Sequence, residues 1–214
     1  MTRPARVRLS PEERSRQLLD LGAELFASTP YEDVHIERVA ELAGVSRGLL
    51  YHYFPSKRAF FAAMVRRQAA TMAEETAPDP SLPAVAQLRA GVTAFLDHIG
   101  RHPHGTRAAY RGAASGDAEV QAVIAESVAL HEERILAALT DDHPREAHPL
   151  LRVAVRSWVV LLRHAGQEWL DDEEGSLDLT EVRDLVVDAF LGMLLGLPEA
   201  ARPPAVAELV AADA

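Results

Sequence analysis

The sequence predicts an all-α protein made of an N-terminal three-helix head and a larger helical body. Apolar residues recur at spacings of three and four along most of the 214 residues, which is the period of an amphipathic helix. Capping residues mark several helix starts, and the sequence contains no convincing strand pattern, hairpin or repeat. A chain of this length can bury a substantial core. We therefore expect two parts, with the head at residues 1–55 and the body at residues 56–214.

The first helix is expected to begin after Ser10. Ser10 takes the N-cap position, Pro11 takes the first helical position, and Glu13 completes a capping box. Leucine and phenylalanine residues follow at helical spacing up to the Ser28-Thr29-Pro30 break. The head therefore starts with one long amphipathic helix.

Two short helices joined by a tight turn are expected next. The first runs from about His35 to Leu42 and ends at Gly44, because glycine permits a left-handed backbone. Ser46 then caps the other helix, with Val45 and Leu50 at the spacing of a hydrophobic staple. This pattern predicts a helix-turn-helix within the head.

The rest of the chain predicts further helices. Ser56 caps a fourth helix, which continues to the proline-rich stretch at residues 77–80. Beyond this stretch, apolar periodicity predicts helices at about Pro83–Gly100, Gly105–Ala114, Ala118–Leu139, His148–Leu170 and Leu179–Leu197. The body is therefore expected to be helical throughout.

The last two of these helices each carry two apolar stripes. On the first of them, one stripe includes Leu151, Val155 and Trp158, and the other includes Leu150, Val153 and Leu161. A helix with two apolar faces needs two partners. We expect one face to enter the core and the other to form a homodimer. In this dimer, residues 148–170 and 179–197 pack against their twofold copies as a four-helix bundle.

The third helix of the head carries the residues with the clearest chemistry. Leu50 and Phe54 are four residues apart and are expected to point inward, as is Val45. The outward face then consists of Arg47, Gly48, Tyr51 and His52. This face suits a DNA major groove, because a guanidinium can bind guanine, glycine allows close approach, and the two rings can hydrogen-bond to bases or phosphates. Lys57 and Arg58 follow at the next helix start, where free N–H groups favour a phosphate.

Charge is distributed unevenly along the chain. The formal net charge is -10, but residues 1–67 hold 11 Lys and Arg against 8 Asp and Glu, which gives +3. The remaining residues hold 11 against 24, which gives -13. Only the first third of the chain can therefore approach phosphates readily.

Residues 39–57 read VAELAGVSRGLLYHYFPSK. This string closely resembles the DNA-binding signature of the tetracycline-repressor (TetR) family of bacterial transcriptional regulators. The resemblance covers the first quarter to third of the chain, and the remainder agrees in length and helical character. It implies a homodimeric repressor whose two heads read double-stranded operator DNA. It also implies that a small-molecule effector of unknown identity binds the body and loosens this grip.

The resemblance widens the set of predicted DNA contacts. His35 stands where the family usually has Ser or Thr, so it either caps the second helix or donates to a phosphate when protonated. Leu49 stands where Thr is common, and it can contact a thymine methyl group. Tyr53 is compatible with a core position, a phosphate contact or both. The full predicted set is His35, Ser46, Arg47, Gly48, Leu49, Tyr51, His52, Tyr53 and Lys57.

The segment 106–111 has two explanations. Arg107 and Arg111 are four residues apart, and like charges at this spacing are unfavourable unless an anion lies near them. Pairing with acidic neighbours such as Asp117, Glu119 or Glu126 is the first explanation. The second is an effector pocket for an amphipathic acid, whose head group meets one of the arginines. The residues expected in this pocket are Phe95, Arg107, Tyr110, Arg111, Ile124, His131 and Trp158.

Several function classes are disfavoured. The chain has no Cys, which removes thiol nucleophiles and zinc-thiolate sites. His98, His102 and His104 are near one another, but Pro103 breaks the helical spacing, so we expect solvated loop histidines and no metal. Catalytic motifs and cofactor fingerprints are missing from the sequence, so we expect neither an enzyme nor a cofactor. A secretory signal and a membrane span are also missing, which predicts a cytoplasmic protein.

Two alternatives to an effector-controlled repressor stay open. The first is an activator, or a regulator without a small-molecule effector. The second is a helical carrier of small ligands whose head is a structural remnant. The basic, aromatic face of residues 47–57 favours a DNA-binding regulator, because a carrier has no use for such a face.

Overall fold

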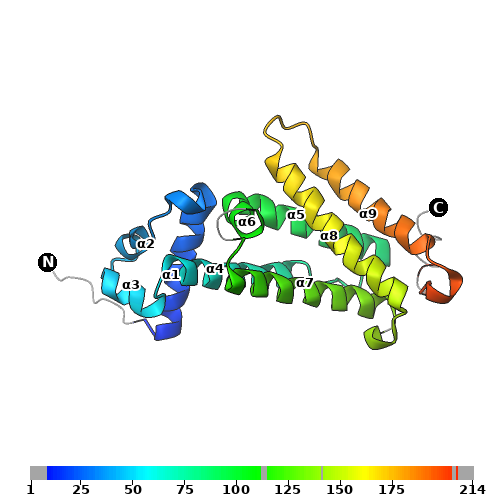
Figure 1. Ribbon diagram of the computed structural model, residues 1–214, viewed down its shortest axis with the longest axis horizontal. Coiled ribbons are helices and arrows are strands. Elements are labelled where there is room, and N and C mark those ends of the chain that lie inside the picture. The colour runs from blue at the N-terminus through cyan, green and yellow to red at the C-terminus, as the bar shows by residue number, and fades with distance from the viewer. Residues whose placement is uncertain (1–8, 112–114, 141, 204–205, 207–214) are drawn as a thin grey trace. The chain divides into compact units, whose positions relative to one another are not determined.

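The computed structural model describes residues 9–111, 115–140, 142–203 and 206 (Figure 1). These residues form nine α-helices and three short 3-10 helices, and no strand occurs among them. The predicted all-α fold class is confirmed. The helices are α1 (Pro11–Ser28), α2 (Glu37–Leu42), α3 (Arg47–Tyr53), α4 (Lys57–Glu75), α5 (Ala84–Arg101), α6 (Pro103–Tyr110), α7 (Ala118–Leu139), α8 (Pro149–Asp171) and α9 (Leu179–Leu195).

The expected helix bounds differ from the observed ones by a few residues. Helix α2 begins two residues later than expected, at Glu37, and α9 ends at Leu195. Helix α6 ends at Tyr110, and residues 112–114 of the expected helix lie outside the described residues. These shifts fall at helix ends, where short turns compete with the helical hydrogen-bond pattern.

The chain divides into two compact units. The first, the head unit, contains the described residues up to Arg67 together with His104–Gln121. The second, the body unit, contains Gln68–Pro103 and the described residues from Ala122 onward. The division of roles between residues 1–55 and 56–214 stays a prediction.

An aromatic cluster forms the core of the head unit. The ring of Phe26 on α1 lies 5.2 Å from that of Phe61 and 6.3 Å from that of Phe60, both on α4, between ring centroids. The Tyr31 ring meets Phe61 edge-on at 4.9 Å. Gly22 on α1 lies directly against the Phe60 ring, where a side chain would collide with it. Helices α1 and α4 are therefore held close together by ring packing.

Local capping fixes where the helices of the head begin. At α1, the Glu13 N–H donates to the Ser10 hydroxyl oxygen at 3.1 Å, and the Glu13 carboxylate accepts from the Ser10 N–H at 2.7 Å. This is the predicted capping box. At α3, the Leu49 N–H donates to the Ser46 hydroxyl oxygen at 3.1 Å. Gly44, between α2 and α3, has a φ of 64°, the left-handed conformation predicted for it.

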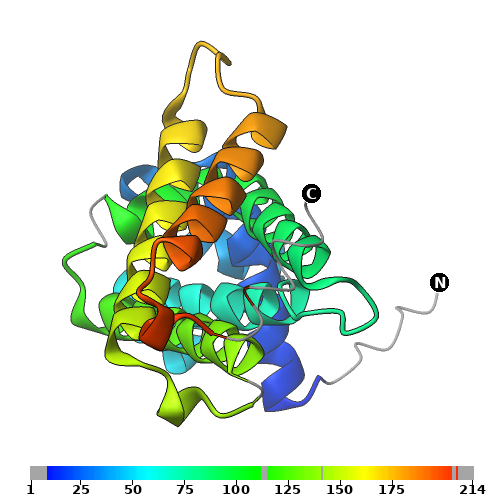
Figure 2. The same cartoon turned by 90° about the vertical axis from the view of Figure 1, so that its right-hand side faces the viewer.

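Helices α5, α8 and α9 form the core of the body unit. Figures 1 and 2 show α8 and α9 side by side, and α9 also packs against α5. The Trp158 ring on α8 lies 4.4 Å from the Phe190 ring on α9, between ring centroids. The Trp158 indole N–H donates to the backbone carbonyl of Val186 at 2.8 Å. The tryptophan therefore joins α8 to α9 through both packing and a hydrogen bond.

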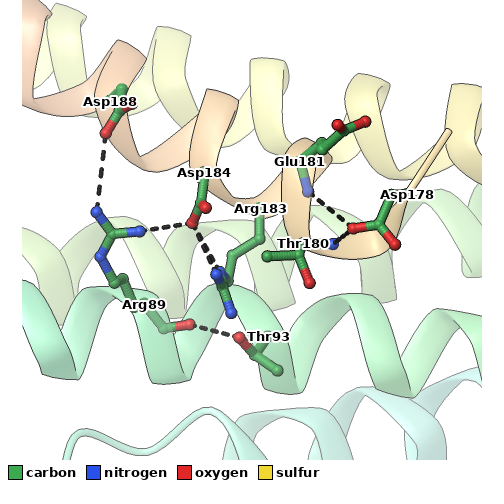
Figure 3. Close-up of polar contacts among 8 residues, drawn as sticks. All are labelled: Arg89, Thr93, Asp178, Thr180, Glu181, Arg183, Asp184 and Asp188. Carbon is green, nitrogen blue, oxygen red and sulfur yellow. Dashed lines mark hydrogen bonds and ion pairs between the residues drawn. The ribbon is translucent and has the colours of Figure 1, made fainter.

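Ion pairs join α5 to α9 at the edge of this core (Figure 3). The Arg89 guanidinium on α5 contacts Asp184 at 2.5 Å and Asp188 at 3.9 Å, and Arg183 contacts Asp184 at 2.9 Å. The Asp178 carboxylate caps α9 by accepting from the N–H groups of its first turn. These side chains are partly exposed, so the ion pairs add less to stability than the apolar core.

Within the described part of the chain, every helix is too short or too polar to cross a membrane.

Gly22→Ala is expected to destabilise the head unit. A Cβ built at Gly22 lies 2.3 Å from Cζ of Phe60, and the Phe60 ring is fully buried, so the ring has no free space to move into. Overpacking of this kind costs about 1–3 kcal/mol. Urea unfolding followed by circular dichroism measures the loss. The matched control is Gly105→Ala in the same unit, because a Cβ there meets no described atom within 4 Å. Equal unfolding midpoints for both variants would contradict the prediction.

Candidate nucleic-acid interface

The exposed side of α3 carries most of the predicted DNA contacts. Leu50 is fully buried and Phe54 is nearly so, and both face the core of the head. The side chains on the opposite side are exposed: Ser46, Arg47, Leu49, Tyr51 and His52, with Gly48 among them. The buried and exposed positions agree with the helical spacing seen in the sequence. A guanidinium, two rings and an exposed leucine therefore lie on one accessible surface.

A hydrogen bond from α3 to α2 restrains the centre of this surface. The Tyr51 hydroxyl donates to Oε1 of Glu37 at 2.6 Å, although the residues are 14 positions apart. This bond is the main reason why the pKa of Glu37 lies below its ordinary value and the pKa of Tyr51 lies above its own. The charge of Arg47 acts on the pKa of Glu37 in the same direction as this bond. Spacing along the sequence gave no sign of this pair, because the contact depends on how α2 packs against α3.

Lys57 is held in place at the start of α4. Its ammonium donates to the backbone carbonyl of Glu32 at 3.1 Å and lies 4.6 Å above the centre of the Tyr31 ring. Burial lowers the pKa of Lys57, while the nearby carboxylates, Glu32 first among them, act in the opposite direction. The Ala59 N–H donates to the Ser56 hydroxyl oxygen at 3.1 Å, which confirms the predicted cap. These contacts hold the Lys57 ammonium in place, and the neighbouring Arg58 is exposed.

The structure also shows where His35 and Tyr53 lie in the head unit. His35 is exposed and lies before α2, whose N-cap position belongs to Ile36. Tyr53 is half-buried, with its ring edge-on to that of His52 at 5.7 Å and 6.4 Å from that of Phe54. This position combines a partly buried ring with access to solvent, so Tyr53 fits both of the roles considered for it.

The residues predicted for an effector pocket fall into both units. Phe95, Ile124 and Trp158 are buried in the body unit. His131, also in the body unit, donates from Nδ1 to the carbonyl of Ser127 at 2.7 Å, and its Nε2 lies 2.9 Å from the Thr76 hydroxyl oxygen. Arg107, Tyr110 and Arg111 belong to the head unit. The pocket stays a prediction.

The expectation of solvated loop histidines is wrong for His104, which lies in α6, and for His98. This residue lies inside α5 and is only 3% exposed. Its Nδ1–H donates to the Glu75 carboxylate at 2.9 Å, and Arg101 donates to the same oxygen at 2.6 Å. Burial lowers the pKa of His98, and the bond from Arg101 lowers the pKa of Glu75. His98 occupies the apolar face of α5 between Phe95 and Ile99, and Glu75 satisfies its polar nitrogen. In the described residues, no group of three or more His, Asp or Glu is placed to hold a metal ion.

Two family models match the chain. The model described as "Bacterial regulatory proteins, tetR family" matches residues 18–64. The model described as "Tetracyclin repressor-like, C-terminal domain" matches residues 85–193. The first match contains α2 and α3, and the second contains α5 through most of α9.

Individual proteins show the same similarity over most of the chain. The HTH-type transcriptional repressor KstR of Rhodococcus jostii is 26% identical over 182 residues, 85% of this chain and 84% of KstR. The HTH-type transcriptional activator FasR of Mycolicibacterium smegmatis is 26% identical over 168 residues, 78% of this chain and 76% of FasR. The crystal structure of a tetR-family transcriptional regulator from Streptomyces coelicolor superposes with a TM-score of 0.82 at 26% identity. That match covers 96% of this chain and 91% of the other.

Proposed function

The chain belongs to the TetR family of DNA-binding transcriptional regulators, and we propose that it is a homodimeric repressor released from its operator by a small molecule. Membership in this family makes it a regulator and not an enzyme. The observation that carries the DNA-binding part of the proposal is the exposed face of α3, where Arg47 and Tyr51 lie opposite the buried Leu50.

Two relatives of the chain support repression, and one supports activation. The repressor KstR matches 85% of the chain, and the repressor AcnR of Corynebacterium diphtheriae is 38% identical over 64 residues. FasR, which matches 78% of the chain, is an activator and supports activation instead. Transcription in vitro from the promoter that the protein binds decides between them. A repressor lowers transcript yield, and an activator raises it.

DNA recognition is proposed to divide between base contacts and phosphate contacts. Arg47, exposed on α3, is suited to the two acceptors of guanine in the major groove. Lys57 is anchored near the start of α4, where the first-turn N–H groups also favour a phosphate. Base contacts determine sequence preference, whereas phosphate contacts determine position and salt dependence.

Arg47→Ala and Lys57→Ala are therefore expected to act differently on operator binding. Arg47→Ala weakens binding and blurs the base preference. Lys57→Ala weakens binding to all sequences alike and lowers the slope of log affinity against log salt concentration by about one unit. Gel-shift titrations at several salt concentrations, with operator and unrelated duplexes, measure both effects. Unchanged operator affinity in the double variant Arg47→Ala/Tyr51→Ala would exclude this face as the DNA-reading surface.

The homodimer is proposed to form through α8 and α9. Val153 and Val160 on α8 are 60% and 57% exposed, and Leu185 on α9 is 65% exposed. Leu150 and Leu195 extend this apolar surface. The other stripe of α8, with Leu151, Val155 and Trp158, is buried in the body core. An apolar surface on two adjacent helices is typical of a subunit interface.

Val160→Asp combined with Leu185→Asp is expected to convert the dimer into a monomer, because each charge would be buried at the interface without a partner. These positions are exposed, whereas Leu161 and Met193 on the same two helices pack partly against the body core and would report on folding as well as on assembly. Light scattering coupled to gel filtration measures the mass. Leu130→Asp, at an exposed leucine on α7, is the control and should keep the dimer mass. A folded wild-type monomer at micromolar concentration would overturn the proposal.

The effector is proposed to be an amphipathic acid that binds the body. Trp158 is a suitable reporter, because its indole is buried between α8 and α9 and is bonded to the Val186 carbonyl. Acyl thioesters or aromatic acids are expected to change its fluorescence and to release operator DNA. The change is compared with that caused by neutral and cationic compounds of similar size. If only the neutral or cationic compounds change the fluorescence and release the DNA, the proposal of an acidic effector is wrong.

A further inference from the structure

A carboxylate lies beside the α3 face that is proposed to bind DNA. Glu37, in the first turn of α2, accepts the hydrogen bond of the Tyr51 hydroxyl at 2.6 Å. Tyr51 is exposed, and Glu37 is half-exposed. The pair therefore lies at the surface of the head, and Glu37 extends the α3 face onto α2.

Glu37 is ionised at neutral pH, as an exposed carboxylate ordinarily is. The bond from Tyr51 has the largest effect in lowering the pKa of Glu37, and the Arg47 guanidinium acts in the same direction. Both of these neighbours belong to the predicted DNA-contact set. An ionised carboxylate at this position is repelled by phosphates and weakens binding to every DNA sequence, unless it meets a hydrogen-bond donor on a base.

Only some base edges offer such a donor in the major groove. Cytosine presents its N4 amino group there, which is the usual partner of Glu and Asp. Guanine presents two acceptors, thymine presents an acceptor and a methyl group, and the adenine amino group lies beside the N7 acceptor, which repels a carboxylate. A carboxylate has about four lone-pair sites, so the bond from Tyr51 leaves acceptor capacity for a base.

We propose that Glu37 is a specificity-determining residue that selects a cytosine in each operator half-site, with Tyr51 holding its carboxylate in position. This inference rests on the proposed use of the α3 face for operator reading. Arg47, exposed on α3, is suited to guanine. The two side chains together would favour G·C pairs at neighbouring positions of the operator.

A purely structural role for the Glu37–Tyr51 bond is the competing explanation. Helices α2 and α3 are already joined by the buried residues Val39, Ala40 and Leu50 and by the turn at Gly44. An exposed side-chain bond adds little to such a contact. The two explanations differ in what they predict for base preference. If the Glu37–Tyr51 bond is purely structural, removing it leaves the base preference of the protein unchanged.

Selection of binding sites from a randomised DNA duplex library tests the proposal. The full-length wild type is expected to select cytosine at one position of each half-site. Glu37→Gln is expected to change that preference to adenine, because an amide matches the N6 and N7 groups of adenine. The preference at the other positions stays the same. Glu37→Ala removes the preference, a loss of roughly 5- to 100-fold in discrimination.

Three further variants separate the possible outcomes. Glu41→Gln, on the same helix but paired with Arg38 at 2.6 Å, is the matched control and should select the wild-type sequence. Tyr51→Phe leaves the carboxylate but removes its anchor, so the preference should broaden at the Glu37 position. Glu37→Asp keeps the charge on a shorter side chain and should weaken the cytosine preference there. It serves as the charged test if the neutral variants fail to fold by circular dichroism.

The proposal is wrong if folded Glu37→Gln and Glu37→Asp select the same bases as the wild type, whether or not overall affinity changes. Arg47→Ala distinguishes this result from a failure of the proposed function. If Arg47→Ala also selects the wild-type sequence, the α3 face does not read DNA and both proposals fail. If Arg47→Ala alone alters the selection, operator reading by α3 stands and the role of Glu37 is excluded.

Discussion

The burial of Leu50 determines which side chains α3 presents. An α-helix turns by about 100° per residue, so fixing one position inward determines the direction of every other position on a seven-residue helix. Phe54, one turn later, is a second inward anchor, and the Ser46 cap sets the residue at which the helix begins. The exposure of Arg47, Tyr51 and their neighbours follows from these three constraints. The candidate interface therefore depends on two buried residues, Leu50 and Phe54, that are not themselves predicted DNA contacts.

The same dependence on close packing recurs in both units. In the head, the absence of a side chain at Gly22 lets the Phe60 ring pack against α1. In the body, Gly166 on α8 lies so close to α5 that an added Cβ would be 2.6 Å from Cδ1 of Ile99. Polar contacts such as Arg89 with Asp184 are distributed around these cores at partly exposed positions. Close packing of apolar side chains therefore determines the fold, and the partly exposed ion pairs contribute less to it.

Features that depend on local sequence were predictable. The capping box at Ser10 and the helix starts after Ser46 and Ser56 involve residues three positions apart, so their hydrogen bonds can be inferred from the sequence. The inward position of Leu50 and the left-handed Gly44 follow from helical geometry and backbone sterics. The same reasoning placed the predicted DNA-contact residues of α3 on one exposed surface.

Features that depend on tertiary contacts were not predictable. Glu37 and Tyr51 meet only because α2 packs against α3, and the indole of Trp158 finds its partner on α9, 28 residues away. His98 lies inside the predicted Pro83–Gly100 helix, but its burial was missed because the carboxylate that pairs with its imidazole, Glu75, comes from α4. In each case the deciding partner comes from another helix, and its identity is not encoded in local spacing.

The position of Lys57 has a consequence for chemical labelling. It is the only lysine in the 214 residues, where arginine supplies every other basic side chain apart from histidine. Burial lowers the pKa of its ammonium, so the nucleophilic free amine forms at a lower pH than in an exposed lysine. An acylating reagent therefore finds a single side-chain amine in this protein, anchored at the start of α4 beside the surface expected to face DNA. Acylation of this one side chain therefore reports whether that surface is occupied.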